Sequence, residues 1–261
     1  MMTDRPDVQE DAGLWGARLL IFESLGSTNR WTLDLLEELT HGDVIRAVRQ
    51  TAGRGRHDRH WIAPDDRGLA ISVALKDLPD RVPATAFNQA PALAVRDALT
   101  PYGLTCMVKW PNDVFVLDYK ICGILAESSR DGIVVGIGLN VNLTDADFAC
   151  VVLNQPATSM SLELGGVFDI ARVCADVVTQ LQVQFDRLND HGMQPMLDDW
   201  ASCDWLAGFR VRVTAECGEL EGRYTGLSAD GRLTLVTGDG TPHQVLSGDV
   251  ERLFPDVDTP D

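Results

Sequence analysis

The sequence is short of positive charge. Its 261 residues include 22 lysines and arginines against 39 aspartates and glutamates, which gives a formal net charge of −17 at pH 7. Contacts to nucleic-acid phosphates need a basic face, so this balance argues against a DNA- or RNA-binding protein. No apolar run reaches the roughly 20 residues of a membrane-spanning helix. Residues 1–16 are polar and acidic, unlike a secretion signal or a transit peptide. We therefore expect a cytoplasmic protein.

Motifs for metals, disulfides and dinucleotides are also missing. The six cysteines contain no C-x-x-C pair, and the five histidines contain no H-x-x-x-H pair. This pattern favours reduced cysteines in the core over zinc ligands or disulfides, and we expect no transition metal held by the protein. No G-x-G-x-x-G motif follows a predicted strand, which argues against a doubly wound dinucleotide-binding fold.

Hydrophobic periodicity predicts a large first domain of strands and helices. Strands are expected at 18–22, 44–48, 69–75, 105–110, 114–117, 120–127 and 133–142, and the alternation in 69–75 indicates a half-buried strand. Helices are expected from Ser27 onward and at 84–99, 168–188 and 195–200. Pro91 predicts a kink or a later helix start, and Asp169 is the expected cap of the third helix. Short turns between successive strands indicate antiparallel pairing.

The pattern changes after residue 208 to short strands separated by turns. These strands are expected at 210–215, 220–227, 233–237 and 243–246. Such spacing is typical of a small antiparallel barrel of the SH3-like kind. The acidic residues 255–261 are expected to be a disordered tail.

A loop rich in glycine and arginine stands out against the acidic background. Residues 50–61 read Gln-Thr-Ala-Gly-Arg-Gly-Arg-His-Asp-Arg-His-Trp. Glycine lets backbone N–H groups approach a ligand, and arginine offers a planar fork of donors suited to carboxylate or phosphate. Taken alone, such a run is more often a flexible basic surface loop.

Three further clusters share the chemical character of this loop. They are Lys109-Trp-Pro-Asn-Asp113, Lys120-Ile-Cys-Gly-Ile-Leu-Ala-Glu127 and Gly136-Ile-Gly-Leu-Asn-Val-Asn142. Each has an ordinary explanation, because lysines at strand ends are usually solvated, Asn-Asp is a common turn pair and glycines permit close packing of strands. The run Ser27-Thr28-Asn29 likewise reads as a helix cap, although a helix N-terminus also presents free N–H donors to a ligand.

Together these clusters describe a site that activates a carboxylic acid. A carboxylate becomes reactive when it attacks the α-phosphate of ATP, because the resulting acyl-adenylate carries AMP as its leaving group. The step brings two anions together and needs fixed cations and usually Mg²⁺. The candidate cations are Arg54, Arg56, Lys109 and Lys120. Trp61 and Asn140 can hold an adenine ring, and Asp113 can orient or deprotonate an incoming amine.

The order of these motifs resembles that of biotin protein ligases. The matching motifs are Ser27-Thr-Asn29, Gln50 to Arg56 with Arg59 and Trp61, Lys109 to Asp113, Lys120 to Glu127 and Gly138-Leu-Asn140, in a match that runs from about Ser24 to Leu253. The resemblance implies an α+β fold of the class II synthetase-like kind. Its mixed, mainly antiparallel sheet would have helices packed on one face, and an SH3-like C-terminal barrel would follow. The implied segments are a tail (1–16), a catalytic domain (17–205), the SH3-like domain (206–254) and the acidic tail (255–261).

The reaction implied by the resemblance has two steps. Biotin and ATP, with Mg²⁺, give biotinyl-5′-AMP, and biotin then passes to a lysine of the biotin carboxyl carrier protein of an acetyl-CoA or related acyl-CoA carboxylase. The implied catalytic residues are Arg54, Arg56, Lys109, Asp113 and Lys120. The implied biotin contacts are Ser27, Thr28, Asn29, Gln50, Arg54, Gly55, Arg56 and Lys120. The implied ATP or adenylate contacts are Trp61, Lys109, Asn140 and Asn142. Either a monomer or a homodimer is compatible with the family.

The chain departs from the family pattern in two places. Asp58 stands where these ligases usually have glycine, and its charge near bound phosphates bears on the affinity for ATP. Only about 17 residues precede the first predicted strand, too few for the winged-helix domain of ligases that double as repressors, so we expect a monofunctional ligase that binds no DNA. The alternatives are a lipoate ligase or acyl transferase, and a biotin- or nucleotide-binding protein without catalysis.

Overall fold

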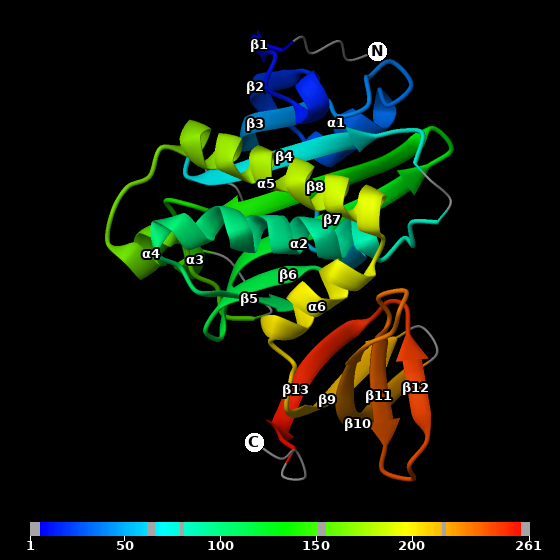
Figure 1. Cartoon of the computed structure of the whole chain (residues 1–261). Helices are drawn as coiled ribbons and strands as arrows, with labels where there is room; N and C mark the ends of the chain where they lie inside the picture. Colours follow the sequence, from blue (N-terminus) through cyan, green and yellow to red (C-terminus); the bar gives the residue numbers. More distant parts are fainter. Residues whose placement is uncertain (1–5, 62–65, 79–80, 151–154, 216–217, 257–261) are drawn as a thin grey trace.

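A computed structural model describes residues 6–61, 66–78, 81–150, 155–215 and 218–256, which form a larger domain and a smaller C-terminal domain (Figure 1). The larger domain is built on an eight-stranded sheet in the order β1-β2-β3-β4-β8-β7-β6-β5. Its strands are β1 (Val8–Glu10), β2 (Leu19–Leu25), β3 (Val44–Gln50), β4 (Gly68–Leu75), β5 (Cys106–Lys109), β6 (Asp113–Val116), β7 (Tyr119–Ser129) and β8 (Gly132–Asn140). The pair β2 and β3 is parallel, and the other neighbouring strands are antiparallel. The predicted mixed, mainly antiparallel α+β fold is therefore confirmed.

Helices pack against the sheet and shield its centre. The helices are α1 (Thr28–Asp34), α2 (Ala86–Leu99), α3 (Asp145–Ala149), α4 (Met160–Leu164), α5 (Ile170–His191) and α6 (Gln194–Ser202), with short 3₁₀ turns η1 (Leu14–Gly16), η2 (Arg56–Asp58) and η3 (Thr100–Tyr102). Helices α2 and α5 lie side by side across one face of the sheet (Figure 1). A second, smaller apolar cluster that includes Phe22 and Leu36 packs beside α1.

The central strand β4 corrects one expectation. All of its residues are buried, so the predicted half-buried strand is wrong. The physical reason is that the larger apolar cluster takes Ile71 and Val73 while the smaller cluster takes Ala74, so both faces of β4 are covered. Pro91 lies inside α2, which begins later than predicted, at Ala86.

The N-terminal segment is more than a tail where the structure describes it. Residues Val8–Glu10 pair with β2 as its edge strand, and the Leu14 side chain is fully buried.

The cysteines follow the prediction in part. Cys106, Cys122 and Cys174 are buried, Cys203 is half-buried, and Cys150 is exposed. The exposed thiol of Cys150 is an exception to the expectation of cysteines in the core; Cys217 lies outside the described residues.

The C-terminal domain is a five-stranded antiparallel sheet in the order β12-β11-β10-β9-β13. Its strands are β9 (Phe209–Ala215), β10 (Gly218–Leu227), β11 (Leu233–Thr237), β12 (Pro242–Val245) and β13 (Asp249–Pro255). The strand β13 was not predicted, because charged side chains interrupt its apolar pattern; it pairs with β9. The expected disordered tail at 255–261 is therefore corrected at its start, because Pro255 belongs to β13 and Asp256 is buried. Residues 257–261 lie outside the described residues.

The two domains meet at Trp205 and Arg252. The indole N–H of Trp205 donates to the carbonyl of Leu117 at 3.0 Å. The guanidinium of Arg252 stacks 3.4 Å from the centre of the Trp205 ring and pairs with Asp118 at 3.2 Å. These contacts hold β13 against the turn between β6 and β7, so the C-terminal domain forms one side of the cavity described next.

Among the described residues, no helix is long and apolar enough to cross a membrane.

Candidate active site

A pocket of about 850 Å³ collects the clusters that are scattered along the sequence. Of the residues predicted for the site, those that line it are Ser27, Thr28, Asn29, Gln50, Arg54, Gly55, Arg56, Trp61, Lys109, Asp113, Lys120 and Asn140. The ends of β3, β5, β7 and β8 and the start of α1 bring them together. The candidate cations therefore share one cavity, although their segments lie far apart in the chain.

Asn142 is the predicted site residue that does not line this pocket. Strand β8 ends at Asn140, and the Asn142 side chain holds the following turn instead. Its amide nitrogen donates to the carbonyl of Phe168 at 2.8 Å, and its oxygen accepts from the backbone N–H of Phe168 and from the hydroxyl of Ser161, each at 2.9 Å. We therefore assign Asn142 a structural role and withdraw it from the nucleotide contacts.

One end of the pocket is formed by the N-terminus of α1. Ser27 caps this helix by accepting from the backbone N–H of Arg30 at 3.4 Å. The backbone N–H and the hydroxyl of Thr28 both donate to the side-chain oxygen of Gln50, at 2.8 and 3.2 Å. The Gln50 amide is thereby oriented with its oxygen on Thr28, so its NH₂ group is the part available as a donor to a ligand.

Asn29 supports this wall from behind. Its amide nitrogen donates to the carbonyl of Leu125 at 3.0 Å and to the carboxylate of Glu127 at 2.9 Å, while its oxygen accepts from the Ser72 hydroxyl at 2.6 Å. Gly136 makes room for this amide, because a Cβ there would lie 2.1 Å from the Asn29 oxygen. Both protons of the amide are used by the protein, so the geometry favours a positioning role for Asn29 over the predicted contact with biotin.

The same carboxylate anchors the glycine- and arginine-rich loop. Arg54 pairs with Glu127 at 3.1 Å, and Arg54 and His60 form an antiparallel bridge that folds the loop back on itself. Glu127 belongs to a motif that the sequence made visible, but its link between Asn29 and Arg54 was missed, because nothing local shows which side chains the fold brings to a strand.

The Trp61 indole packs against two glycines of the sheet, Gly123 and Gly138. A Cβ at Gly138 would lie 2.2 Å from the indole, and one at Gly123 would lie 3.1 Å from it. These two positions on neighbouring strands therefore must lack a side chain for the ring to reach the sheet. The Lys120 ammonium lies 5.7 Å from the centre of the ring. The glycines of the sequence motifs thus shape the pocket as well as the strand packing.

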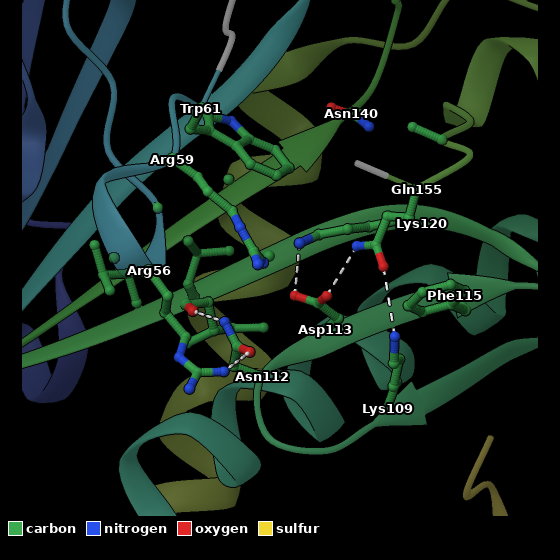
Figure 2. A pocket seen from close by; sticks show the side chains of 18 of the residues that line it. Arg56, Arg59, Trp61, Lys109, Asn112, Asp113, Phe115, Lys120, Asn140 and Gln155 are labelled. Atoms are coloured by element: carbon green, nitrogen blue, oxygen red, sulfur yellow. Dashed lines mark hydrogen bonds and ion pairs between the residues drawn. The ribbon is translucent and has the colours of Figure 1, made fainter. Parts of the chain in front are cut away.

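A row of three charged side chains and one amide crosses the pocket, in the order Lys120, Asp113, Gln155 and Lys109 (Figure 2). The Lys120 ammonium contacts one carboxylate oxygen of Asp113 at 2.6 Å, and the Gln155 amide nitrogen donates to the other at 3.1 Å. The Lys109 ammonium donates to the Gln155 oxygen at 3.5 Å. Burial lowers the pKa of Lys109, although the Asp113 carboxylate opposes this shift.

Gln155 belongs to a segment that sequence reasoning missed. The backbone of Lys120 donates to the carbonyl of Pro156 and accepts from the N–H of Thr158, both at 2.9 Å, which ties residues 155–158 to the start of β7. The Asn140 amide donates to the carbonyl of Thr158 at 2.9 Å and is buried. The segment has no hydrophobic periodicity, so no local signal could have placed it beside the lysines.

Arg56 reaches across the pocket to the C-terminal domain. Its guanidinium donates to the Ser247 hydroxyl at 3.0 Å and to the carbonyl of Gly248 at 3.2 Å. Arg59 pairs with Asp249. The pKa of Arg56 is lowered by burial, against the opposing effect of Asp249. Arg56 and Arg59 therefore connect the two domains, a contact that the sequence did not reveal.

The backbone of the loop contains one left-handed residue. It is His57 (φ 53°, ψ 45°), which lies inside η2 next to Asp58. Histidine is among the non-glycine residues enriched in this region.

Among the described residues, no group of three or more His, Cys, Asp or Glu side chains could hold a metal ion.

This geometry suits a reaction between two anions. Arg54, Arg56 and the lysines contribute fixed positive charge to one cavity, and the α1 end offers oriented donors. Asp113 places a carboxylate next to Lys120 in the same cavity. Such an arrangement can hold a carboxylic acid next to a phosphate and then receive an amine.

Comparisons with known proteins agree with this chemistry. The Biotin/lipoate A/B protein ligase family matches residues 21–143, and the Biotin protein ligase C terminal domain matches residues 208–253. The biotin--[acetyl-CoA-carboxylase] ligase of Mycobacterium tuberculosis is 32% identical, with 93% of this chain and 91% of that protein covered. The bifunctional ligase/repressor BirA of Bacillus subtilis is 30% identical, over 90% of this chain and 74% of its own length.

Solved structures show the same arrangement of domains. The biotin protein ligase of Aquifex aeolicus in complex with biotin and ATP superposes with a TM-score of 0.79 at 27% identity, covering 90% of this chain and 99% of that one. The match of both domains, together with relatives of at least 30% identity over most of their length, shows that this chain belongs to the biotin protein ligase family.

Proposed function

We propose that the protein activates biotin with ATP and transfers it to a carrier protein. The first step forms biotinyl-5′-AMP and pyrophosphate, and the second forms an amide with one lysine of the biotin carboxyl carrier protein of an acetyl-CoA or related acyl-CoA carboxylase. This proposal rests on one observation. The N-terminus of α1 lines the same pocket as the candidate cations, which are Arg54, Arg56, Lys109 and Lys120. Mg²⁺ enters with the nucleotide as part of the substrate Mg-ATP.

In the first step the protein supplies charge and orientation. The α1 end, with Ser27, Thr28 and Gln50, receives the biotin ring, and Lys120 bridges the biotin carboxylate and the α-phosphate. Arg54 and Arg56 neutralise the phosphates, while Trp61 and Asn140 hold the adenylate. Each oriented donor of this kind contributes roughly 2.7–4 kcal/mol in the transition state.

In the second step Asp113 orients the amine of the carrier lysine. This carboxylate faces the pocket and forms an ion pair with Lys120 at 2.6 Å. An ionised carboxylate binds an ammonium group well, so we assign Asp113 the orientation of the acceptor lysine in preference to the removal of its proton.

A lipoate ligase is the alternative within the same fold, because one of the matching families includes biotin and lipoate ligases. The C-terminal domain favours biotin, since residues 208–253 match a domain of biotin protein ligases. Calorimetry with biotin and with lipoate, each in the presence of ATP, separates the two. Binding of lipoate without binding of biotin would end the biotin assignment. Pyrophosphate release on addition of biotin and ATP separates an enzyme from a binding protein without catalysis.

We expect this enzyme in the cytoplasm, working as a monomer or a homodimer. Light scattering on the full chain with and without biotin and ATP distinguishes the two assemblies.

Gly138→Ala should displace Trp61 and weaken the adenylate site. A Cβ at this position would lie 2.2 Å from the indole, so the ring must leave the sheet. We expect the KM for ATP to rise at least about tenfold, with a stability loss of roughly 1–3 kcal/mol from overpacking. Steady-state kinetics and thermal unfolding measure the two effects.

The matched control is Gly166→Ala, where the added Cβ would meet only Phe168 at 3.9 Å. This variant should keep the wild-type KM. A Gly138→Ala enzyme with an unchanged KM for ATP would remove Trp61 from the nucleotide site.

A further inference from the structure

We infer that Gln155 is a positioning residue for the transfer step, because it holds Asp113 in place when Lys120 turns to the substrate. The inference rests on the proposed function, since it assigns a residue to the second half of that reaction. Gln155 lies outside every motif by which the chain resembles its family, and its place in the pocket comes from the structure alone (Figure 2).

The orientation of the Gln155 amide is fixed by its two neighbours. Lys109 can only donate and the ionised Asp113 can only accept, so the amide oxygen must face Lys109 and the NH₂ group must face Asp113. The distances, 3.5 and 3.1 Å, agree with this orientation. The amide thus joins two charged groups on adjacent strands through a side chain that carries no charge itself.

Asp113 is held from both sides before substrates bind. Lys120 contacts one carboxylate oxygen at 2.6 Å, and Gln155 donates to the other at 3.1 Å. The proposed first step draws the Lys120 ammonium toward the biotin carboxylate and the α-phosphate. The contact with Lys120 then weakens, and the oxygen that it occupied becomes free for the ammonium group of the carrier lysine.

The hydrogen bond from Gln155 to Asp113 is expected to persist while the Lys120 side chain moves. Its backbone neighbours Pro156 and Thr158 are hydrogen-bonded to the backbone of Lys120, so the segment stays in place when the lysine side chain moves. The remaining bond to Gln155 fixes the direction of the free carboxylate oxygen. Without it, Asp113 rotates, and the amine loses its alignment with the acyl carbon.

The chemistry of the step balances without a further reactant. The carrier ammonium loses one proton to solvent, and the amine nitrogen forms a bond to the acyl carbon of biotinyl-5′-AMP. The bond between that carbon and the phosphate oxygen then breaks, AMP leaves with the electron pair, and the second proton of the former ammonium is lost to solvent. Asp113 orients the amine, and Gln155 orients Asp113.

The test separates the two half-reactions in the full-length enzyme. Gln155→Met keeps the length of the side chain and removes its hydrogen bonds. We expect biotin- and ATP-dependent pyrophosphate release in a single turnover to stay within about threefold of wild type. Transfer from purified biotinyl-5′-AMP to a carrier domain should slow roughly 10- to 100-fold, as expected for the loss of about one hydrogen bond to a charged group.

Gln155→Glu adds a readout that a merely structural residue would not give. Glutamate matches glutamine in size, so the packing of the side chain is kept. Its carboxylate would face Lys109 on one side and repel Asp113 on the other. We therefore expect the maximal rate of transfer from purified biotinyl-5′-AMP to fall at least as far as in Gln155→Met, with an unchanged temperature of thermal unfolding. Transfer by Gln155→Glu at the wild-type rate would overturn the inference.

Other outcomes are equally decisive. Equal losses in both half-reactions of Gln155→Met, or unchanged transfer, would overturn the positioning role. A failure of the proposed function is recognised separately, because wild type itself would then release no pyrophosphate with biotin and ATP.

Discussion

Lys120→Ala should nearly abolish the formation of biotinyl-5′-AMP. Lys120 lies at the start of β7. Its ammonium is 2.6 Å from Asp113, and the lysine lines the same pocket as Arg54 and Arg56. Removing a donor aimed at developing charge costs roughly 10²- to 10³-fold in rate. Pyrophosphate release in the presence of biotin and Mg-ATP, without carrier, measures this step directly.

The control for lost positive charge is Arg30→Ala. Arg30 is exposed on α1, where it forms an i,i+4 ion pair with Asp34, so its loss should leave the rate close to wild type. If Lys120→Ala releases pyrophosphate at the wild-type rate while carrier labelling is lost, the lysine acts in transfer and the assignment to adenylation is wrong.

Arg56→Gly should let the reactive adenylate escape from the pocket. Arg56 ties the loop to Ser247 and Gly248 of the C-terminal domain, and it is the predicted partner of the adenylate. One hydrogen bond to a charged group contributes roughly 1.5–3 kcal/mol, which corresponds to about 10- to 100-fold faster dissociation. We expect biotin to label lysines of an unrelated bystander protein, as seen by mass spectrometry.

His57→Gly is the matched control for loop flexibility. His57 already has a positive φ, so glycine fits its backbone, and Arg56 remains in place. This variant should label only the carrier domain. Strict carrier specificity in Arg56→Gly would count against the role of Arg56 in retaining the adenylate.

The sequence was most informative where structure depends on neighbours along the chain. Ser27 and Asp169 were predicted as helix caps and accept backbone N–H groups as caps do. The strands and helices with clear periodicity were found, with shifted ends. The strand β13 was missed because Glu251 and Arg252 interrupt its apolar pattern, and pairing with β9 stabilises it nonetheless.

The sequence predicted which residues belong to the candidate site, but not which of their side chains contact one another. Motif chemistry selected the cations that now share one cavity. It could not show that Glu127 joins Asn29 to Arg54, or that Gln155 lies between Lys109 and Asp113, because these contacts depend on how distant strands meet.

The same reason explains the two reassigned asparagines. Asn29 and Asn142 have the residue type expected of ligand contacts; Asn29 lines the pocket, and Asn142 lies two residues after Asn140, which also lines it. Their amides are nevertheless bound within the protein, Asn29 to Glu127 and Ser72, and Asn142 to Phe168 and Ser161. Only the folded chain shows whether an amide is left for a ligand.

The most direct test of the account is the mass of a biotin carrier domain after incubation with the full-length protein, biotin and Mg-ATP. The shared pocket of cations predicts that the carrier gains one biotinyl group, only when both substrates are present, and at a single lysine. An unmodified carrier together with no pyrophosphate release would contradict the account.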